Sequence, residues 1–282
     1  MVNNKDKQEI EKWFKFLRNE ICNTFEDIEN KFQHSKIKIK PGKFKKKKWY
    51  RSNNGGGGEM AIMKGRIFEK VGVNISTVYG NFSKEFRNQI PGCKKSPKFW
   101  ASGISLVAHM HSPHITAAHF NTRHIITSKS WFGGGTDITP TIKNKKNINL
   151  FHNSLKNTCN NYQKNSYIKF KKWCDEYFFL KHRNETRGAG GIFFDYLNSK
   201  NYKKDFEFIQ NVGKCFLSIY PKIIINNIKK NWTKNDREKL LIKRGRYAEF
   251  NLLYDRGTQF GLKTGGNVEA ILMSMPPKAK WI

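Results

Sequence analysis

Hydrophobic side chains recur at two different periods along this chain. In residues 5–33 the large apolar side chains stand three and four positions apart, which predicts an amphipathic helix. They are Ile10, Phe14, Leu17, Ile21, Phe25 and Ile28. Short β-branched and aromatic runs, separated by Gly, Pro and Asn, predict strands over 66–80, 101–109, 117–127 and 130–140. Because no helical pattern interrupts 101–140, we expect an antiparallel meander there.

The second half of the chain returns mainly to helical spacing. Helices are predicted over 145–182, 203–219 and 233–243, with Pro221 ending or bending the second of them. Segments 246–255 and 267–275 are predicted to be a closing pair of strands. The lysine- and glycine-rich residues 36–58 are expected to form a loop. Since neither a repeat nor a linker is evident, residues 1–282 are interpreted as one α+β domain.

The charge balance restricts the partners. The chain of 282 residues has 53 Lys+Arg against 22 Asp+Glu, a net charge of +31, which attracts polyanions. A basic nucleic-acid-binding protein is therefore one hypothesis. The other is codon drift in an AT-rich genome, since Asn and Ile are abundant too. The lysines are scattered over all segments, which favours drift, so no nucleic-acid partner is expected.

Three weaker signals indicate the cellular compartment of the protein. The five cysteines are odd in number and form no CxxC pair, which suits a reducing environment. The N-terminus has no apolar signal-peptide core, and no apolar run approaches the length of a membrane span. We therefore expect a cytoplasmic protein without an integral membrane segment.

Candidate chemistry concentrates in HMHSPHITAAHFNTRH, residues 109–124, which hold five of the eight histidines. Because alternate residues of a strand share a face, His119, Asn121 and Arg123 point the same way. Ser105 and His109 share a face of the preceding predicted strand. If the two strands pair, one face presents all these polar groups. The alternatives are a solvent-exposed sheet surface and a histidine-based metal hydrolase. Standard GxSxG, HExxH and Walker motifs are absent.

Long stretches of this sequence resemble one family. The stretches are HFNTRH, WFGGGTDITP, KKWCDEYFFLKHRNETRGAGGIFFDYL, RGRYAEFNLLYDRGTQFGLKTGG with EAILMSMPP, and GGGG followed by GRIFEKVGVNIS. Taken in their order along the chain, with the GGGG stretch first, they are similar to the oxygen-dependent coproporphyrinogen III oxidases of haem and porphyrin biosynthesis, over roughly residues 8–282. The resemblance implies a large antiparallel sheet flanked by helices on both faces, and a homodimer formed through 247–282.

The resemblance also implies a reaction. Coproporphyrinogen III would lose the carboxyl groups of the propionates on rings A and B, leaving vinyls and giving protoporphyrinogen IX. Dioxygen is the oxidant, and carbon dioxide and hydrogen peroxide are released. No obligatory cofactor is expected, since dioxygen is a co-substrate, and a divalent metal cation is the alternative.

Site residues follow from the matched motifs. His119, Arg123 and Asp137 match catalytic positions, with His119 as proton donor, Arg123 as a clamp for a propionate and Asp137 near the pyrrole N–H groups. The expected substrate contacts are Ser105, Asn121, Thr122, Arg123, Gly265, Gly266 and Asn267. The expected ligands of a divalent metal, if one is bound, are His109, His119, His152 and His182.

The chain departs from the family pattern at several positions. Asn267 replaces a common Arg, ITAAH at 115–119 replaces VPTxH, and the chain stops at PPKAKWI where a further C-terminal helix is expected. A drifting copy of the enzyme with low activity is therefore an alternative to a fully active one.

Overall fold

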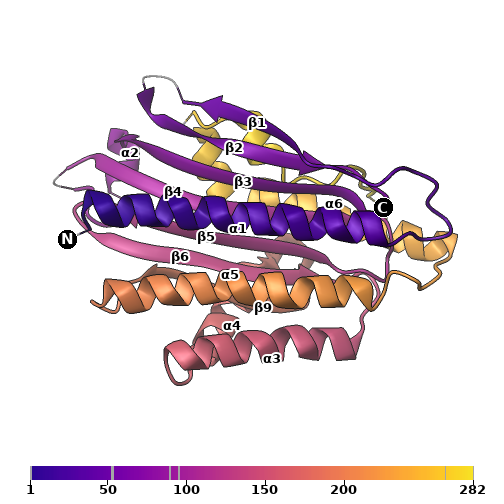
Figure 1. Cartoon of the computed structure of the whole chain (residues 1–282). Helices are drawn as coiled ribbons and strands as arrows, with labels where there is room; N and C mark the ends of the chain where they lie inside the picture. The colour runs from indigo at the N-terminus through magenta and orange to yellow at the C-terminus, as the bar shows by residue number, and fades with distance from the viewer. Residues whose placement is uncertain (1, 52–53, 89, 95, 264, 282) are drawn as a thin grey trace.

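One antiparallel sheet organises the molecule. The computed structural model describes residues 2–51, 54–88, 90–94, 96–263 and 265–281. Seven strands lie in the order β1-β2-β3-β4-β5-β6-β9, so the first six follow one another as a meander (Figure 1). Each neighbouring pair is antiparallel. The predicted α+β class with a large antiparallel sheet is confirmed.

The elements have the following bounds. The strands of the large sheet are β1 (Lys45–Tyr50), β2 (Gly56–Met63), β3 (Phe68–Asn81), β4 (Lys98–Met110), β5 (Ala117–Ile126), β6 (Ser130–Thr139) and β9 (Gly190–Leu197). A separate pair is β7 (Phe179–Leu180) and β8 (Glu185–Thr186), joined through the 3₁₀ turn Lys181–Arg183. The helices are α1 (Asn4–Lys31), α2 (Lys84–Arg87), α3 (Lys145–Tyr162), α4 (Ser166–Tyr177), α5 (Tyr202–Ile225), α6 (Lys234–Leu253), α7 (Arg256–Lys263) and α8 (Val268–Leu272).

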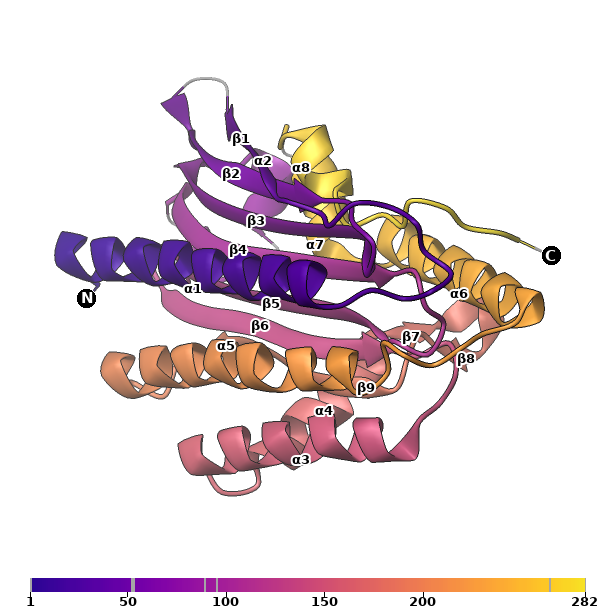
Figure 2. The same cartoon turned by 45° about the vertical axis from the view of Figure 1, so that its right-hand side comes forward.

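Helices cover both faces of this sheet. Helices α1 and α5 lie side by side across one face, and α3 packs against α5 (Figures 1 and 2). Helices α6, α7 and α8 lie on the opposite face, and α4 runs along β9 (Figure 2). The predicted flanking of the sheet on both sides is therefore confirmed.

The main hydrophobic core lies between the sheet and the α1–α5 layer. The predicted N-terminal helix is present: the Asn3 side chain accepts a hydrogen bond from the Asp6 backbone N–H, and the Asp6 carboxylate accepts one from the Asn3 backbone N–H. Its apolar stripe is buried, and each such side chain contributes about 1.5–3 kcal/mol. Alternate strand residues such as Leu106, Phe120 and Phe194 meet it from the sheet. The other face of β4, β5, β6 and β9 is consequently free to carry polar groups.

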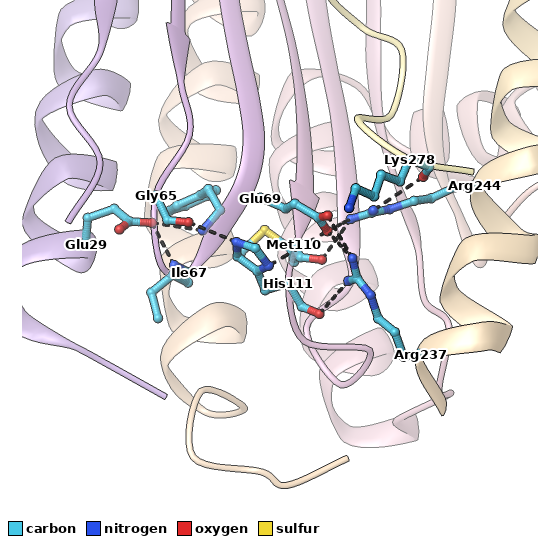
Figure 3. A network of polar contacts seen from close by, with 10 residues as sticks. Glu29, Gly65, Ile67, Glu69, Met110, His111, Arg237, Arg244 and Lys278 are labelled. Atoms are coloured by element: carbon cyan, nitrogen blue, oxygen red, sulfur yellow. Dashed lines mark hydrogen bonds and ion pairs between the residues drawn. The ribbon is translucent and has the colours of Figure 1, made fainter. Parts of the chain in front are cut away.

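A partly buried ionic network holds α6 at one end of the sheet. Glu69 of β3 accepts hydrogen bonds from Arg237 at 2.7 Å and pairs with Arg244 at 2.8 Å, and both arginines belong to α6 (Figure 3). Arg244 also donates to the Met110 carbonyl at the end of β4. Burial opposes the charge on Glu69, but the two arginines outweigh it and lower its pKa. The network sets where α6 lies over the polar face.

Four sequence predictions are wrong in detail. Residues 246–253 continue α6, and 268–272 form α8, so the closing pair of strands does not exist. The sequence did carry a helical pattern in this segment, because the buried residues of α6 recur at helical spacing. They include Leu240, Arg244, Tyr247, Ala248 and Asn251. The turn-rich stretch between the two segments suggested a pair of strands, but packing against the sheet decides the outcome.

The predicted loop over 36–58 is wrong for 45–50 and 56–58, which belong to β1 and β2. Lysines mask the strand because β1 is an edge strand, where only Trp49 is buried. The predicted helix over 145–182 is divided into α3 and α4, and α5 passes through Pro221 to Ile225 instead of ending there. Within the described residues, no helix combines the length and the apolar character needed to span a bilayer.

Candidate active site

The predicted polar residues share the sheet face that is turned away from α1 and α5. The register places Ser105 of β4 opposite Asn121 of β5, and His119 opposite Asp137 of β6. Arg123 lies on the same face, two residues beyond Asn121, with Gly133 of β6 opposite it. We call this surface of β4, β5, β6 and β9 the polar face. The sequence prediction that one face gathers these groups is confirmed by the register.

Asp137 is the buried centre of this face. Its Oδ1 lies 3.0 Å from His119 Nδ1, and its Oδ2 accepts a hydrogen bond of 2.6 Å from Arg187 Nη2. The Asp137 side chain is 2% exposed, whereas that of His119 is 20% exposed. Burial alone would raise the pKa of Asp137, but Arg187 and His119 outweigh it and hold the pKa below its usual value. Asp137 is therefore a buried carboxylate ion that presents His119 to solvent.

Arg187 is enclosed by aromatic rings. Its guanidinium carbon lies 3.9 Å from the centroid of Phe178, 4.7 Å from that of Phe250 and 4.8 Å from that of Tyr247. Rings in these positions stabilise a cation through their quadrupoles. Burial opposes the charge, yet the pairing with Asp137 prevails and the pKa of Arg187 is raised. The buried pair is thus built from β6, the loop before β9, and α6.

Arg123 occupies the more open part of the polar face. Its side chain is 30% exposed. Arg123 Nη2 donates to Asp195 Oδ2 of β9 at 2.7 Å, and Nη1 donates to Asn121 Oδ1 at 3.3 Å. Asn121 in turn donates from Nδ2 to the Ile104 carbonyl of β4. A half-exposed guanidinium held in this way can bind a carboxylate with its remaining N–H groups.

Two other predicted contact regions are placed differently. Thr122 lies on the opposite face and is fully buried, so its side chain points away from the polar face. Asn267 is the N-cap of α8, where its side chain accepts from the Ala270 backbone at 2.9 Å. Gly265 and Gly266 precede this cap, on the side of the sheet where α7 and α8 lie (Figure 2). Their contact with substrate stays a prediction.

The histidines predicted to bind a metal do not come together. His109 is bonded to the Ser274 carbonyl, and His152 to Tyr167 and the Ala189 carbonyl. His182 is bonded to Tyr254 and Glu249, and His119 to Asp137. Among the described residues, no group of three or more His, Cys, Asp or Glu side chains is arranged to hold a metal ion. These four residues, as placed, do not fit one metal centre.

A groove of about 720 Å³ lies elsewhere, between α1 and strands β1, β2 and β3. Its lining includes Lys15 and Arg18 of α1, together with Glu59 of β2 and Thr77 of β3. None of the residues that define the polar face lines it. The candidate site therefore rests on its chemistry and on comparison with known proteins.

Residues 9–282 match the family model described as coproporphyrinogen III oxidase. This chain belongs to the coproporphyrinogen III oxidase family. A relative from Rickettsia bellii (strain RML369-C), named oxygen-dependent coproporphyrinogen-III oxidase, is 57% identical over 280 residues, covering 99% of this chain and 100% of the relative. Relatives of the same name from Rickettsia africae and Rickettsia akari are each 56% identical, over 99% and 98% of this chain and 100% and 98% of their own lengths. The family resemblance read from the sequence is confirmed.

Membership of the coproporphyrinogen III oxidase family does not by itself reveal Asp195 or the buried role of Arg187, and the predicted site set omitted both. Asp195 had a usable signal, because Gly191, Phe193 and Asp195 alternate along a strand and Gly191 lies opposite Asp137. Arg187 had no such signal, because no periodicity in the sequence distinguishes it from Arg183 nearby. In the structure, however, Arg187 is buried and Arg183 is half-exposed at the surface.

Proposed function

We propose that the polar face is the active site at which this chain oxidatively decarboxylates coproporphyrinogen III. The propionates on rings A and B become vinyls, and the product is protoporphyrinogen IX. The proposal is supported by family membership over residues 9–282 together with the gathering of His119, Arg123 and Asp137 on one face. The comparisons favour this activity over the nucleic-acid-binding and metal-hydrolase hypotheses.

Each decarboxylation has a simple balance. A propionate, one dioxygen and one proton give a vinyl group, carbon dioxide and hydrogen peroxide. The hydrogen on the carbon next to the ring leaves with two electrons and reduces dioxygen, and the carbon–carboxylate bond supplies the electron pair of the new double bond. The protein must therefore hold a carboxylate, supply or receive protons, and keep the electron-rich porphyrinogen positioned.

Arg123 is the proposed carboxylate clamp. Its guanidinium is permanently charged, half-exposed and held at one side by Asp195 and at the other by Asn121. The remaining N–H groups can bind a propionate through parallel hydrogen bonds. Ser105, opposite Asn121 on β4, is the adjacent polar contact for the same substrate.

His119 and Asp137 are the proposed proton-transfer pair. Because Asp137 contacts His119 Nδ1, the Nε2 atom is left for exchange with substrate. Asp137 is too buried to be the first contact of a large ligand, so its carboxylate acts by orienting His119. Arg187 keeps Asp137 ionised while it does so. This modifies the expectation that Asp137 itself meets the pyrrole N–H groups.

The proposed working form is a homodimer that uses residues 247–282. Five large apolar side chains of this region are 41–55% exposed: Leu252, Leu253, Leu262, Val268 and Trp281. Exposed apolar surface of this kind marks interfaces. Sedimentation should give a dimer for the native chain and a monomer for a Leu252→Glu, Leu253→Glu variant. A native chain that sediments as a monomer at micromolar concentration would contradict the dimer.

No resident metal is assigned to the reaction, because the four predicted histidines contact separate partners. Metal analysis of enzyme that is active after chelator treatment is the test. Activity that disappears with chelation and returns with one divalent ion would instead establish a metal requirement. A cytoplasmic location stays a prediction.

The activity test uses anaerobic and aerobic incubation with coproporphyrinogen III, followed by oxidation and protoporphyrin fluorescence. Oxygen-dependent product is expected. Turnover far below that of the Rickettsia bellii relative would identify a low-activity copy, and absence of product would reject the proposed function.

A further inference from the structure

Asp195 is the second carboxylate of the polar face, and neither the family motifs cited above nor the proposed mechanism gives it a role. We propose that Asp195 is a positioning residue, which holds the Arg123 guanidinium so that its free N–H groups face a substrate propionate. This inference rests on the proposed function, because it assigns a task within the same site.

The contact between Arg123 and Asp195 crosses a whole strand. Arg123 belongs to β5 and Asp195 to β9, and β6 lies between them. The pair closes at 2.7 Å because Gly133 stands beneath it on β6. A Cβ atom at Gly133 would lie 2.5 Å from Asp195 Oδ1 and 3.2 Å from Arg123 Nε. The absence of a side chain at 133 is thus a steric requirement of the pair.

A β-bulge in β9 presents Asp195 at this point. Phe132 pairs with Leu197 and Gly134 with Phe194, so Asp195 and Tyr196 together oppose the single residue Gly133. Tyr196 takes a φ of 54°, an uncommon conformation for a residue with a side chain. Its backbone N–H donates to Asp195 Oδ1 at 3.0 Å. Bulges next to active sites commonly redirect a side chain, and this one anchors the carboxylate.

The difference in burial between Asp195 and Arg123 shows which of the two side chains a substrate can reach. Asp195 is 8% exposed and Arg123 is 30% exposed, so the carboxylate is enclosed while the guanidinium remains accessible. One N–H of Nη1 goes to Asn121 and one of Nη2 to Asp195. The Nε–H and one further N–H on each terminal nitrogen are left for a ligand. Asn121 and Asp195 therefore hold the guanidinium from both sides without using up its donors.

The electrostatic consequence gives a kinetic signature. Asp195 places a negative charge beside the group that binds an anionic substrate. An Asp195→Asn substitution removes this charge but keeps the side-chain size, so a tetracarboxylate substrate should bind at least as tightly. The fixed orientation of Arg123 is lost, and kcat should fall about tenfold or more, because misplaced binding groups forfeit orientation effects. A purely structural residue would not separate KM from kcat in this way.

The experiment measures kcat, KM and Tm with coproporphyrinogen III for the native chain, Asp195→Asn, Arg123→Ala and the double variant. Asp27→Asn on α1 is the matched control, since it removes an exposed acid that pairs with Lys31 across a helix turn, far from the polar face. We expect Asp195→Asn to lower kcat at least tenfold without raising KM. In the Arg123→Ala background it should have no further effect on kcat/KM. Asp27→Asn should match the native chain.

Either of two results would overturn the inference: kcat within twofold of native for Asp195→Asn, or an equal fold loss of kcat/KM with and without Arg123. If Asp195→Asn does not fold, Gly133→Ala decides, because it displaces the pair while keeping both charges. Gly133→Ala should then lower kcat as well, and native kcat in that variant would reject the role of Asp195. An inactive native chain would reject the proposed function instead.

Discussion

Replacing Arg187 by Met tests the buried pair on which the site is built. The substitution keeps most of the side-chain volume but removes the cation that lies 2.6 Å from Asp137 Oδ2. Both side chains are 2% exposed, so Asp137 is left as a buried carboxylate with only His119 as partner. Breaking a buried ion pair from one side typically costs about 3–5 kcal/mol. For a chain of this length, that corresponds to a fall in Tm of about 5–8 °C.

The same variant should change the pH dependence of activity. With Arg187 gone, burial dominates and the pKa of Asp137 rises. Asp137 then becomes neutral at a higher pH, and the acid limb of the kcat profile should move to higher pH. Calorimetry and initial rates between pH 5 and 8 measure both effects.

Two comparisons make the Arg187 prediction refutable. Arg183→Met removes a surface arginine that pairs with Glu249, and it should lower Tm much less than Arg187→Met, because solvent screens an exposed pair. An Arg187→Met, Asp137→Leu double variant should regain much of the lost stability, because a buried pair replaced by apolar groups is often neutral. It should stay inactive. Equal Tm losses for Arg187→Met and Arg183→Met, or native activity in the double variant, would show that the Arg187–Asp137 pair does not organise the site.

Two further predictions concern the end of the sheet. His109 is buried in its neutral form, and burial is the main cause that lowers its pKa to about 3. The folded state therefore keeps its full stability above pH 6.5 and loses stability as the pH falls toward 3. His109→Leu should remove about 3 kcal/mol of the stability difference between pH 7 and pH 4 in denaturant titrations, and an unchanged difference would contradict it. Glu69→Gln leaves Arg244 buried without its counter-charge and should lower the free energy of unfolding by about 3 kcal/mol. The control Glu238→Gln breaks an exposed pair with Lys280 and should lower it by about 1 kcal/mol or less. Similar losses for the two would show that the Figure 3 network does not fix α6.

Local periodicity was enough to predict the centre of the fold. The strands from 66 to 140 and the face shared by His119, Asn121 and Arg123 follow from a period of two and short connections. The prediction was wrong where composition conflicts with tertiary position. The lysines of β1 are tolerated because that strand is an edge, and the aromatic residues of 246–253 are helical because they pack over the sheet.

The site was only half predictable for a different physical reason. Asp137 and Arg187 are 50 residues apart, and their contact depends on how the loop before β9 returns beneath α6. Strand alternation places Asp195 on the polar face, but its contact with Arg123 also depends on a bulge in β9 and on Gly133 of β6. Such long-range coincidences leave no period in the sequence. The predicted metal ligands failed to gather for the same reason, since spacing places no constraint on residues from separate segments.

The most direct measurement follows dioxygen uptake and carbon dioxide release together during turnover of coproporphyrinogen III. We expect one dioxygen to be consumed for each carbon dioxide, two of each per protoporphyrinogen IX, and no carbon dioxide to be released under argon. Arg123→Ala and Asp137→Ala should each reduce both rates by orders of magnitude, while Asp27→Asn should not. Carbon dioxide release without dioxygen, or near-native rates in both site variants, would contradict the assignment of this reaction to the polar face.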